Sequence, residues 1–334
     1  MDVVVDAMGS DHAPGPEVAG AIAVVRASDS SVTLVGPSDV LDEALARAGR
    51  TPADRIRVVH ATQAVAMTDH AAAVYRSKPD SSMRRGCELV ARGEGDAFVS
   101  AGNSGAILAC ALFAFKRIPG VDRPAIATVI PTPAGPLVLC DSGANVEPKA
   151  AQLAQFGVLA AAYDRAVHHR ERPRLGLLAN GGEASKGTQL TRDAHALLAA
   201  ARGSFEFLGY VEGSELFRGT VDAIATDGFT GNVVLKTCEG IAEGLFGLVK
   251  EALQETALAR LGGALVAPAL RGLAKKIDYH EIGGALLAGV AKPCVIAHGR
   301  SDGTALASAI RTAARFAAAK LPEALGDAMH ALKT

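Results

Sequence analysis

Short, uninterrupted apolar runs recur along the whole chain and alternate with segments rich in alanine and leucine. Their Val, Ile and Leu residues are consecutive rather than alternating, which is typical of strands that are buried on both faces of a sheet. The segments between them are suited to crossover helices. The pattern predicts a mostly parallel, helix-covered sheet with strands at 2–6, 31–36, 56–60, 96–100, 136–141, 174–179, 205–211, 221–227 and 293–297.

Six of these apolar runs pass directly into glycines and small polar residues before the next helical segment begins. In an open α/β sheet, ligands bind beyond the carboxyl ends of the parallel strands. One glycine-rich turn indicates only a reversal of the chain, but six turns that nearly all carry Asn, Asp, Ser or His favour a binding site. We therefore expect one cleft, lined by the turns at 6–15, 100–106, 141–145, 179–187, 226–232 and 297–303.

Residues 233–277 show a different pattern, which predicts two long helices. Apolar residues recur at helical spacing in the first half of this segment. Residues 257–276 then combine apolar side chains with four bases and no acid, and Gly262, Gly263 and Pro268 indicate a bend. We expect a helical hairpin whose body packs against a second copy of the chain. Its apolar, basic tip is suited equally to such packing and to a membrane interface.

The composition limits the ligands and the compartment of the protein. Of its 334 residues, 49% are hydrophobic, which is enough to bury a sizeable core. The 34 basic and 35 acidic residues nearly cancel, which argues against a surface built for nucleic acid, so any anion binding must be local. The five cysteines form no C-x-x-C pair, and the first residues do not follow a signal-peptide pattern. We expect a cytoplasmic protein.

Motifs for a membrane span or a cofactor are weak or missing. Residues 97–115 carry no charge, but Ser100, Asn103 and Ser104 interrupt them, which favours a strand, a turn and a helix. No G-x-G-x-x-G follows the first strand, and the sequence has no H-E-x-x-H motif or Cys/His cluster. We therefore expect no dinucleotide, no metal and no other cofactor.

The turn ANGGEASKGT at 179–188 resembles a nucleotide-binding P-loop only in part. The lysine of a P-loop follows the last glycine, whereas Lys186 precedes Gly187. The backbone amides of glycine turns at helix N-termini still bind anions. We expect a phosphate or carboxylate ligand, with additional donors from Asn103, Ser104, Ser185, Lys186, Thr230 and Asn232.

A serine nucleophile is not favoured by the sequence. Ser104 lies in GNSG rather than in a G-x-S-x-G elbow. The spacing assigns neither His12 nor His298 to it as a partner, because a catalytic triad is recognised by geometry.

Seven motifs together resemble one known family. In chain order they are DAMGSDHAP, SMRRG, VSAGNSGA, DSGAN, LLANGGEASKG, TDGFTGNVVLKTCEG and HGRSDGTA. They resemble the bacterial phosphate acyltransferases of phospholipid synthesis over essentially the whole chain. The resemblance implies a single α/β/α catalytic domain over residues 1–334, from which the hairpin at 233–277 projects. This three-layer sandwich would be similar to the phosphotransacetylases and to the isocitrate and isopropylmalate dehydrogenases.

The resemblance also implies a reaction and partners. A long-chain acyl group would pass from acyl carrier protein to inorganic phosphate, giving an acyl phosphate. The enzyme would be a homodimer that contacts the membrane peripherally through residues 257–276 and hands its product to a membrane glycerol-3-phosphate acyltransferase. Two other functions stay open: a phosphotransacetylase that acts on acetyl-CoA or another acyl-CoA, and a non-catalytic, membrane-associated module that only binds anions.

The resemblance assigns roles to individual residues. Phosphate can itself attack a thioester, so the protein has to position it and to stabilise charge, and Lys186 and Asn232 are the expected catalytic residues. Expected substrate contacts are Gly102, Asn103, Ser104, Gly105, Asn145, Asn180, Ser185, Thr230, Gly231 and His298. Aspartates repel phosphate, so we expect the aspartates near the cleft to hold turns rather than to contact the ligand. The residues expected to hold turns are Asp6, Gly9, Asp11, Asp141 and Asp227.

An acidic carrier protein would dock on basic residues beside the cleft. Candidates are Arg84, Arg85, Arg260, Arg271, Lys275 and Lys276. The chain departs from the usual residues of the family at Ser10, Ser104, Gly182, Arg300 and Asp302.

Overall fold

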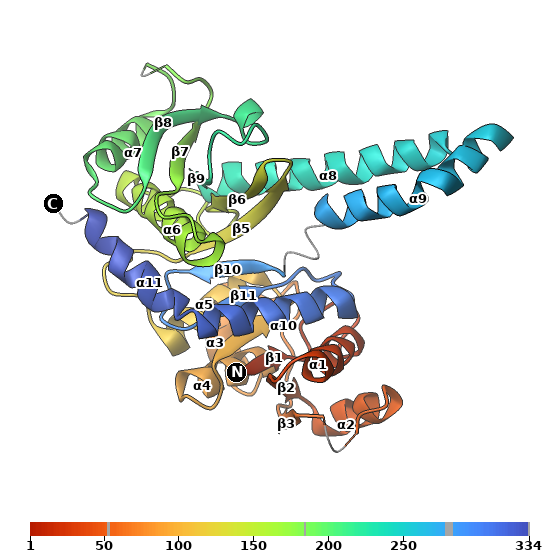
Figure 1. Ribbon diagram of the computed structural model, residues 1–334. Helices are drawn as coiled ribbons and strands as arrows, with labels where there is room; N and C mark the ends of the chain where they lie inside the picture. Colours follow the sequence, from red (N-terminus) through yellow and green to blue (C-terminus); the bar gives the residue numbers. More distant parts are fainter. Residues whose placement is uncertain (52–53, 184, 278–282, 333–334) are drawn as a thin grey trace.

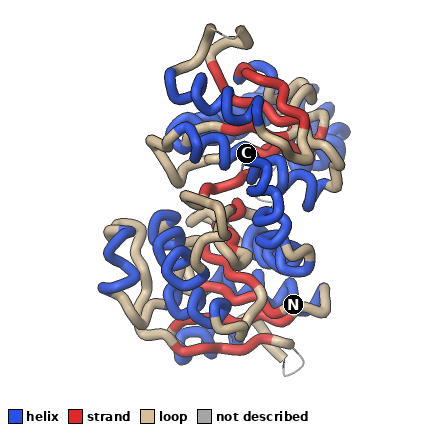
Figure 2. Tube along the Cα trace, turned by 90° about the vertical axis from the view of Figure 1, so that its left-hand side faces the viewer, coloured by secondary structure: helices blue, strands red, loops and turns tan. Residues whose placement is uncertain are grey.

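The computed structural model describes residues 1–51, 54–183, 185–277 and 283–332. Its strands form one 11-stranded sheet in the order β3-β2-β1-β4-β11-β10-β5-β6-β9-β7-β8, with helices on both faces (Figures 1 and 2). The strands are β1 (Asp2–Asp6), β2 (Ser31–Gly36), β3 (Ile56–His60), β4 (Ala97–Ser100), β5 (Ala125–Thr132), β6 (Gly135–Cys140), β7 (Arg174–Ala179), β8 (Glu206–Glu212), β9 (Ala223–Ala225), β10 (Ala285–Ala288) and β11 (Cys294–Ile296).

The helices follow most strands directly, as a crossover topology requires. They are α1 (Gly15–Ala27), α2 (Ser38–Arg47), α3 (Ala71–Ser77), α4 (Ser82–Ala91), α5 (Ser104–Phe115), α6 (Ala150–His168), α7 (Gln189–Ala200), α8 (Gly228–Ala252), α9 (Ala257–Ile277), α10 (Gly303–Ala318) and α11 (Leu321–Ala328). Short 3-10 helices span Gly213–Glu215 and Met329–Leu332.

The apolar runs are continuous because the two faces of each central strand belong to different cores. In β1, Val3 and Val5 pack into the cluster under α1, α6 and α10, whereas Val4 packs into the cluster under α4 and α5. All three valines have no exposed surface. This arrangement confirms the predicted α/β fold with helices on both faces of a sheet.

The sheet is mixed at its centre, and this changes the predicted geometry. The pairs β11-β10, β10-β5 and β5-β6 are antiparallel, whereas the remaining neighbours are parallel. Three reversals in a row make the half from β6 to β8 run opposite to the half from β3 to β11. The carboxyl ends of the strands in the two halves therefore lie at opposite edges of the sheet. The expectation that six turns line one cleft because all of them follow parallel strands at the same edge is wrong.

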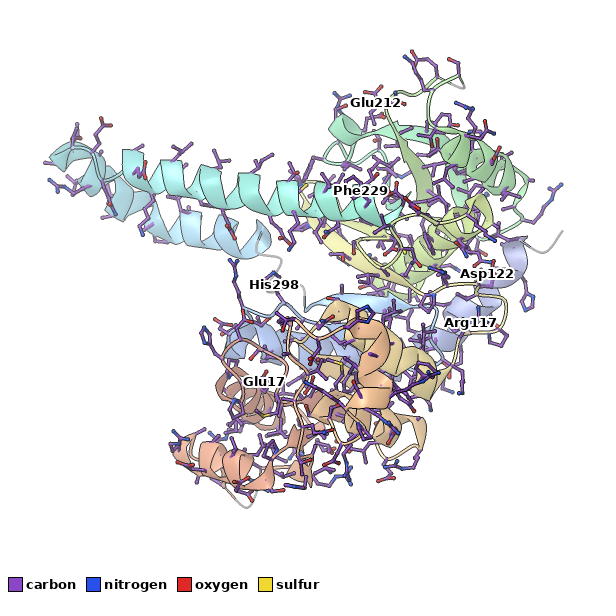
Figure 3. All side chains as sticks on the ribbon, turned by 180° about the vertical axis from the view of Figure 1, so that it is seen from behind. Glu17, Arg117, Asp122, Glu212, Phe229 and His298 are labelled. Carbon is purple, nitrogen blue, oxygen red and sulfur yellow. The ribbon has the colours of Figure 1, made fainter. Side chains whose placement is uncertain are left out.

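Helices α8 and α9 form the predicted hairpin, which projects beyond the rest of the molecule (Figures 1 and 3). The first turns of α8 pack on the sheet through Val234 and Leu235. Farther out, apolar side chains are left exposed, among them Leu258 at 79% and Leu265 at 77%. The chain reverses between α8 and α9, and α9 contains Pro268 without a break. Residues 257–276 are thus a whole helix of the hairpin rather than its tip.

The uncharged segment at 97–115 folds as β4, a turn and α5, as its polar interruptions predict. Among the described residues, no helix combines the length and the apolarity that a membrane span requires.

Candidate active site

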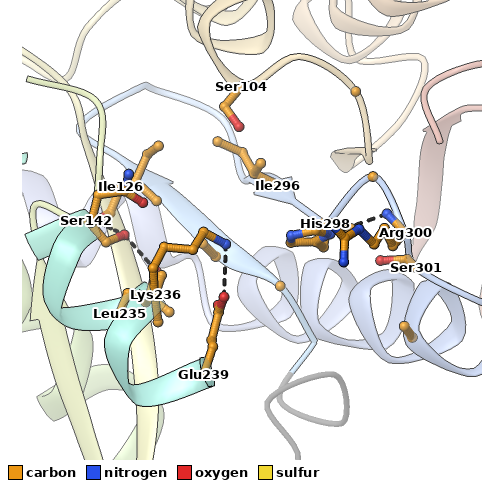
Figure 4. A pocket seen from close by; sticks show the side chains of 18 of the residues that line it. Ser104, Ile126, Ser142, Leu235, Lys236, Glu239, Ile296, His298, Arg300 and Ser301 are labelled. Carbon is orange, nitrogen blue, oxygen red and sulfur yellow. Dashed lines mark hydrogen bonds and ion pairs between the residues drawn. The ribbon is translucent and has the colours of Figure 1, made fainter. Parts of the chain in front are cut away.

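A cleft of about 450 Å³ lies between the two halves of the sheet. Strands β5, β10 and β11 supply Thr128, Ala285 and Ile296 to its wall. Leu235, Lys236 and Glu239 of α8 lie on one side of the cleft, and His298, Arg300 and Ser301 lie on the other side (Figure 4). Every predicted turn except the one at 179–187 contributes to the lining. The residues from these turns are Asp11, Gly102, Ser104, Ser142, Asn232, Ala297, His298, Gly299, Arg300 and Ser301.

Asp6, at the end of β1, holds the turn that follows β4. Its carboxylate accepts hydrogen bonds from Ser82 Oγ at 2.6 Å and from Ser100 Oγ at 2.7 Å. Ser100 Oγ in turn accepts a hydrogen bond from Gly102 N at 3.1 Å. Burial raises the pKa of Asp6. Gly9 approaches so closely that a Cβ there would lie 2.9 Å from Gly102 N. These contacts support the turn-holding role proposed for Asp6 and Gly9.

The first turn of helix α1 contains a buried glutamate that the sequence did not indicate. Glu17 has no exposed surface, and its Oε1 accepts a hydrogen bond from Ser10 N at 3.1 Å. Its other oxygen and the Ser10 hydroxyl are both buried without a hydrogen-bond partner among the described residues. Burial raises the pKa of Glu17 to about 7. The folded protein therefore holds this proton more tightly than the unfolded chain does.

Glu17→Gln is expected to stabilise the protein at pH 8 but much less at pH 5. Between the ordinary pKa of 4.5 and the folded pKa of about 7, the unfolded state loses the proton first. The free energy of unfolding therefore falls as pH rises, by about 3 kcal/mol in total. Glutamine has no charge to bury and keeps an acceptor for Ser10 N. Urea unfolding at both pH values measures the difference. The exposed Glu147→Gln serves as the control, and an equal pH effect in both variants would refute this role of Glu17.

Asp141 organises the start of α8. Its buried carboxylate accepts backbone hydrogen bonds from Ile126 N at 2.9 Å, Ala144 N at 3.0 Å and Asn145 N at 2.6 Å. Burial raises its pKa. A Cβ on Gly231 would lie 1.9 Å from the Asp141 carbonyl oxygen, so only glycine permits this close packing.

Three predicted substrate contacts are instead occupied within the protein. Asn145 Nδ2 donates to Pro124 O at 2.8 Å and to Asp141 Oδ2 at 2.9 Å. Thr230 Oγ1 donates to Asp227 Oδ2 at 2.7 Å, and Asp227 Oδ1 caps α8 by accepting from Thr230 N at 2.8 Å. Asn103 caps α5 through Ala106 N and donates to two backbone carbonyls. In this structure these three side chains therefore hold helix caps and turns, and direct substrate contact by them stays a prediction.

Asn232 and Lys236 present polar groups to the cleft from one face of α8. No described residue hydrogen-bonds to the exposed Asn232 side chain, so its amide is available to a ligand. Lys236 Nζ lies 2.8 Å from Glu239 Oε2 (Figure 4). Sequence reasoning missed Lys236, although the i,i+4 spacing from Asn232 already places both on the same helical face.

The turn after β11 adds a second cation to the cleft. Arg300 N donates to His298 Nδ1 at 3.2 Å, which bends the turn so that both residues line the cleft (Figure 4). Asp11 N donates to Gly299 O at 2.8 Å and ties the first turn to this one. Asp302 caps α10 by accepting from Ala305 N at 2.8 Å. The departures at 300 and 302 thus supply a cation and a helix cap.

Lys186 lies outside the cleft that the other turns line. It is exposed, and its turn stands at the outer end of the second half, above β7 and α7 (Figure 1). Asn180 Oδ1 accepts a hydrogen bond from Gly187 N at 3.0 Å and so shapes this turn. Asn180, Ser185 and Lys186 are therefore separate from Asn232 in this structure.

The cleft is suited to bind an anion. Lys236 and Arg300 supply positive charge beside the carboxylates of Asp11 and Glu239, and the first turns of α5, α8 and α10 reach the lining. The unpaired amides and the dipole of a helix N-terminus attract anions. Among the described residues, no group of three His, Cys, Asp or Glu side chains is suited to hold a metal ion.

Comparison with known proteins gives the family of the chain. The family model described as "Fatty acid synthesis protein" matches residues 1–324. The phosphate acyltransferase of Geotalea daltonii is 45% identical over 317 residues, which are 95% of this chain and 91% of that protein. The phosphate acyltransferase of Myxococcus xanthus is 44% identical, and the match covers 100% of this chain and 96% of the relative.

Solved structures show the same fold at low sequence identity. A phosphotransacetylase from Streptococcus pyogenes has a TM-score of 0.66 at 16% identity, covering 97% of this chain and 94% of that one. The EutD phosphotransacetylase from Staphylococcus aureus has a TM-score of 0.60 at 15% identity, covering 95% and 94% of the two chains. The family model over residues 1–324 and the relatives at 44% and 45% identity show the family of this chain. It belongs to the phosphate acyltransferase family of enzymes, which transfer acyl groups with phosphate.

Proposed function

We propose that the enzyme transfers a long-chain acyl group from acyl carrier protein to inorganic phosphate, for use in phospholipid synthesis. One observation carries the proposal: the side chains of Lys236 and Arg300 and the first turns of three helices reach one cleft, and none of its described lining residues is a cysteine. Such a cleft is suited to an anionic nucleophile that the substrate itself provides.

The proposed reaction needs no covalent enzyme intermediate. A phosphate oxygen attacks the thioester carbonyl carbon, the C–S bond breaks, and the carrier thiolate leaves and takes up a proton from solvent. Lys236 and Arg300 hold the phosphate beside the first turn of α5. The Asn232 amide donates a hydrogen bond to the oxyanion of the tetrahedral intermediate, where a preorganised donor has its largest effect.

Lys186 is included in this proposal because the strand before its turn, β7, is adjacent to the strand before α8. β7 and β9 are adjacent and parallel, with Leu177 paired to Ala225, so the turns at 179–187 and 226–232 leave the sheet side by side. We assign Lys186 to the transition state, which it reaches when its turn folds over the start of α8. Closing turns commonly complete a catalytic site in this way.

The hairpin supports the proposed partners. Its exposed apolar side chains are suited to a homodimer along the body, and Leu258, Leu261 and Leu265 lie beside Arg260, a combination suited to peripheral contact with an anionic membrane. In this proposal residues 1–334 act as one cytoplasmic catalytic domain. The acyl phosphate is then used at the membrane by a glycerol-3-phosphate acyltransferase.

Release of free carrier-protein thiol tests the proposed function. With palmitoyl-acyl carrier protein as substrate, thiol release is expected to depend on inorganic phosphate and to give one acyl phosphate per thiol. Turnover of acetyl-CoA alone would instead assign the enzyme to the phosphotransacetylases. Phosphate binding without thiol release from either substrate would leave only an anion-binding module.

A further inference from the structure

An apolar groove of about 300 Å³ continues from the cleft along α8. It shares Val129, Leu235 and Glu239 with the lining of the cleft, so the two spaces adjoin. Beyond Glu239 its lining carries no charged side chain. The groove therefore begins where the polar groups of the cleft end.

The walls of the groove come from three parts of the chain. Positions from Leu235 to Val249 on α8 line it at helical spacing, and these fourteen steps span about 21 Å at 1.5 Å per residue. Strand β5 and Phe217 form the facing wall, and α9 contributes Leu270. The result is an elongated apolar groove that is open to solvent at Ile241 and Leu245 and adjoins the cleft at one end.

We propose that this groove binds the acyl chain of the substrate, with the thioester held beside Asn232 and Lys236. This inference rests on the proposed function, because it names where the chain of that substrate lies. An unbranched acyl chain matches an elongated apolar groove that adjoins the polar cleft at one end, and each methylene that packs in it adds to binding.

A second copy of the chain is the other occupant to consider. Leu248 is 65% exposed and lines neither the groove nor the cleft. Leu248 lies one helical turn from the groove-lining Leu245, so a second copy that covers Leu248 would adjoin the wall of the groove. Continuity with the cleft favours the acyl chain as the occupant of the groove.

Cys238 provides a natural reporter inside the groove. It lines the groove and is partly exposed, whereas the four other cysteines are buried. Burial raises the pKa of its thiol, so alkylation by iodoacetamide is best followed at alkaline pH. Palmitate at ten times its dissociation constant is expected to slow alkylation about tenfold, whereas butyrate at the same concentration is not.

The labelling result decides the occupant of the groove without any acyl-transfer assay. Equal protection by palmitate and butyrate, or no protection by either, would overturn the proposal. Slow labelling that speeds up on dilution, with no fatty acid present, would assign the groove to a second copy of the chain.

A matched pair of variants tests the groove in catalysis. Ala242→Phe places a ring in the groove, whereas Ala252→Phe places one on an exposed part of the same helix. Each displaced methylene lowers kcat/KM about fourfold, so Ala242→Phe is expected to lower it at least tenfold for palmitoyl-carrier protein. For butyryl-carrier protein the change is expected to stay within about twofold.

The control and the chain-length comparison separate the two proposals. Ala252→Phe is expected to resemble the unmodified enzyme with both substrates. Equal loss on both substrates in Ala242→Phe would refute the groove but not the reaction. Absence of turnover in the unmodified enzyme would refute the reaction. Protection of Cys238 from alkylation would still test whether the groove binds an acyl chain.

Discussion

Asn232→Ala is expected to lower kcat for acyl transfer by about 100-fold while the protein stays folded. Its amide lines the cleft and has no partner among the described residues, so its removal leaves no buried group unsatisfied. Loss of one oxyanion donor typically lowers turnover by about 100-fold to 1,000-fold. Steady-state kinetics with palmitoyl-carrier protein, together with a thermal melt, measure both quantities.

Two control variants distinguish this catalytic role from a structural one. Val233→Ala changes the neighbouring exposed residue on α8 and is expected to retain turnover. Asn145→Ala removes an amide with two internal hydrogen bonds, so it is expected to lower the melting temperature first. Full turnover in Asn232→Ala would remove Asn232 from the mechanism.

Lys236→Met is expected to change mainly the KM for phosphate, whereas Lys186→Met is expected to change mainly kcat. Lys236 lines the open cleft, so it contacts phosphate before reaction, and its loss is expected to raise the KM for phosphate about tenfold or more. Lys186 lies outside the cleft, and in the proposed mechanism it acts only after its turn closes. Its loss is therefore expected to lower kcat about tenfold or more and to leave that KM nearly unchanged.

Phosphate titrations of both variants measure these constants, and Lys250→Met is the control on the same helix. An unchanged KM for phosphate in Lys236→Met would exclude Lys236 as a phosphate ligand. Unchanged turnover in Lys186→Met would show that the closing turn plays no part in the chemical step.

Hydrophobic patterning predicted nine of the eleven strands in the part of the chain that the structure describes. The strands that it missed, β5 and β10, lie at the centre of the sheet. β5 includes Thr128, Pro131 and Thr132, and β10 is a four-residue run between glycines, so neither presents a long apolar run. These two strands reverse the direction of half the sheet. The pattern of apolar residues along a strand indicates which side chains are buried, but it does not indicate which neighbouring strand it pairs with.

The candidate site was predictable to the extent that glycine turns mark strand ends. Gly102, Ser104, Asn232 and His298 line the cleft, as expected. Asn145 and Thr230 have the donor groups expected of a binding residue, yet the carboxylates of Asp141 and Asp227 accept hydrogen bonds from those donors. Lys236 was missed because a lysine inside a helix is usually solvated, and only the position of α8 across the cleft gives it another role.

Helix α8 joins two parts of the enzyme that would otherwise be independent. Its first turns carry Asn232 and Lys236, and its far end lies in the projecting hairpin. The 25 residues form one helix without an internal proline, about 37 Å long. In the proposed mechanism, a partner that fixes the outer end of this helix also sets the orientation of Asn232 toward the substrate. The proposal therefore predicts that assembly through the hairpin changes the rate of acyl transfer.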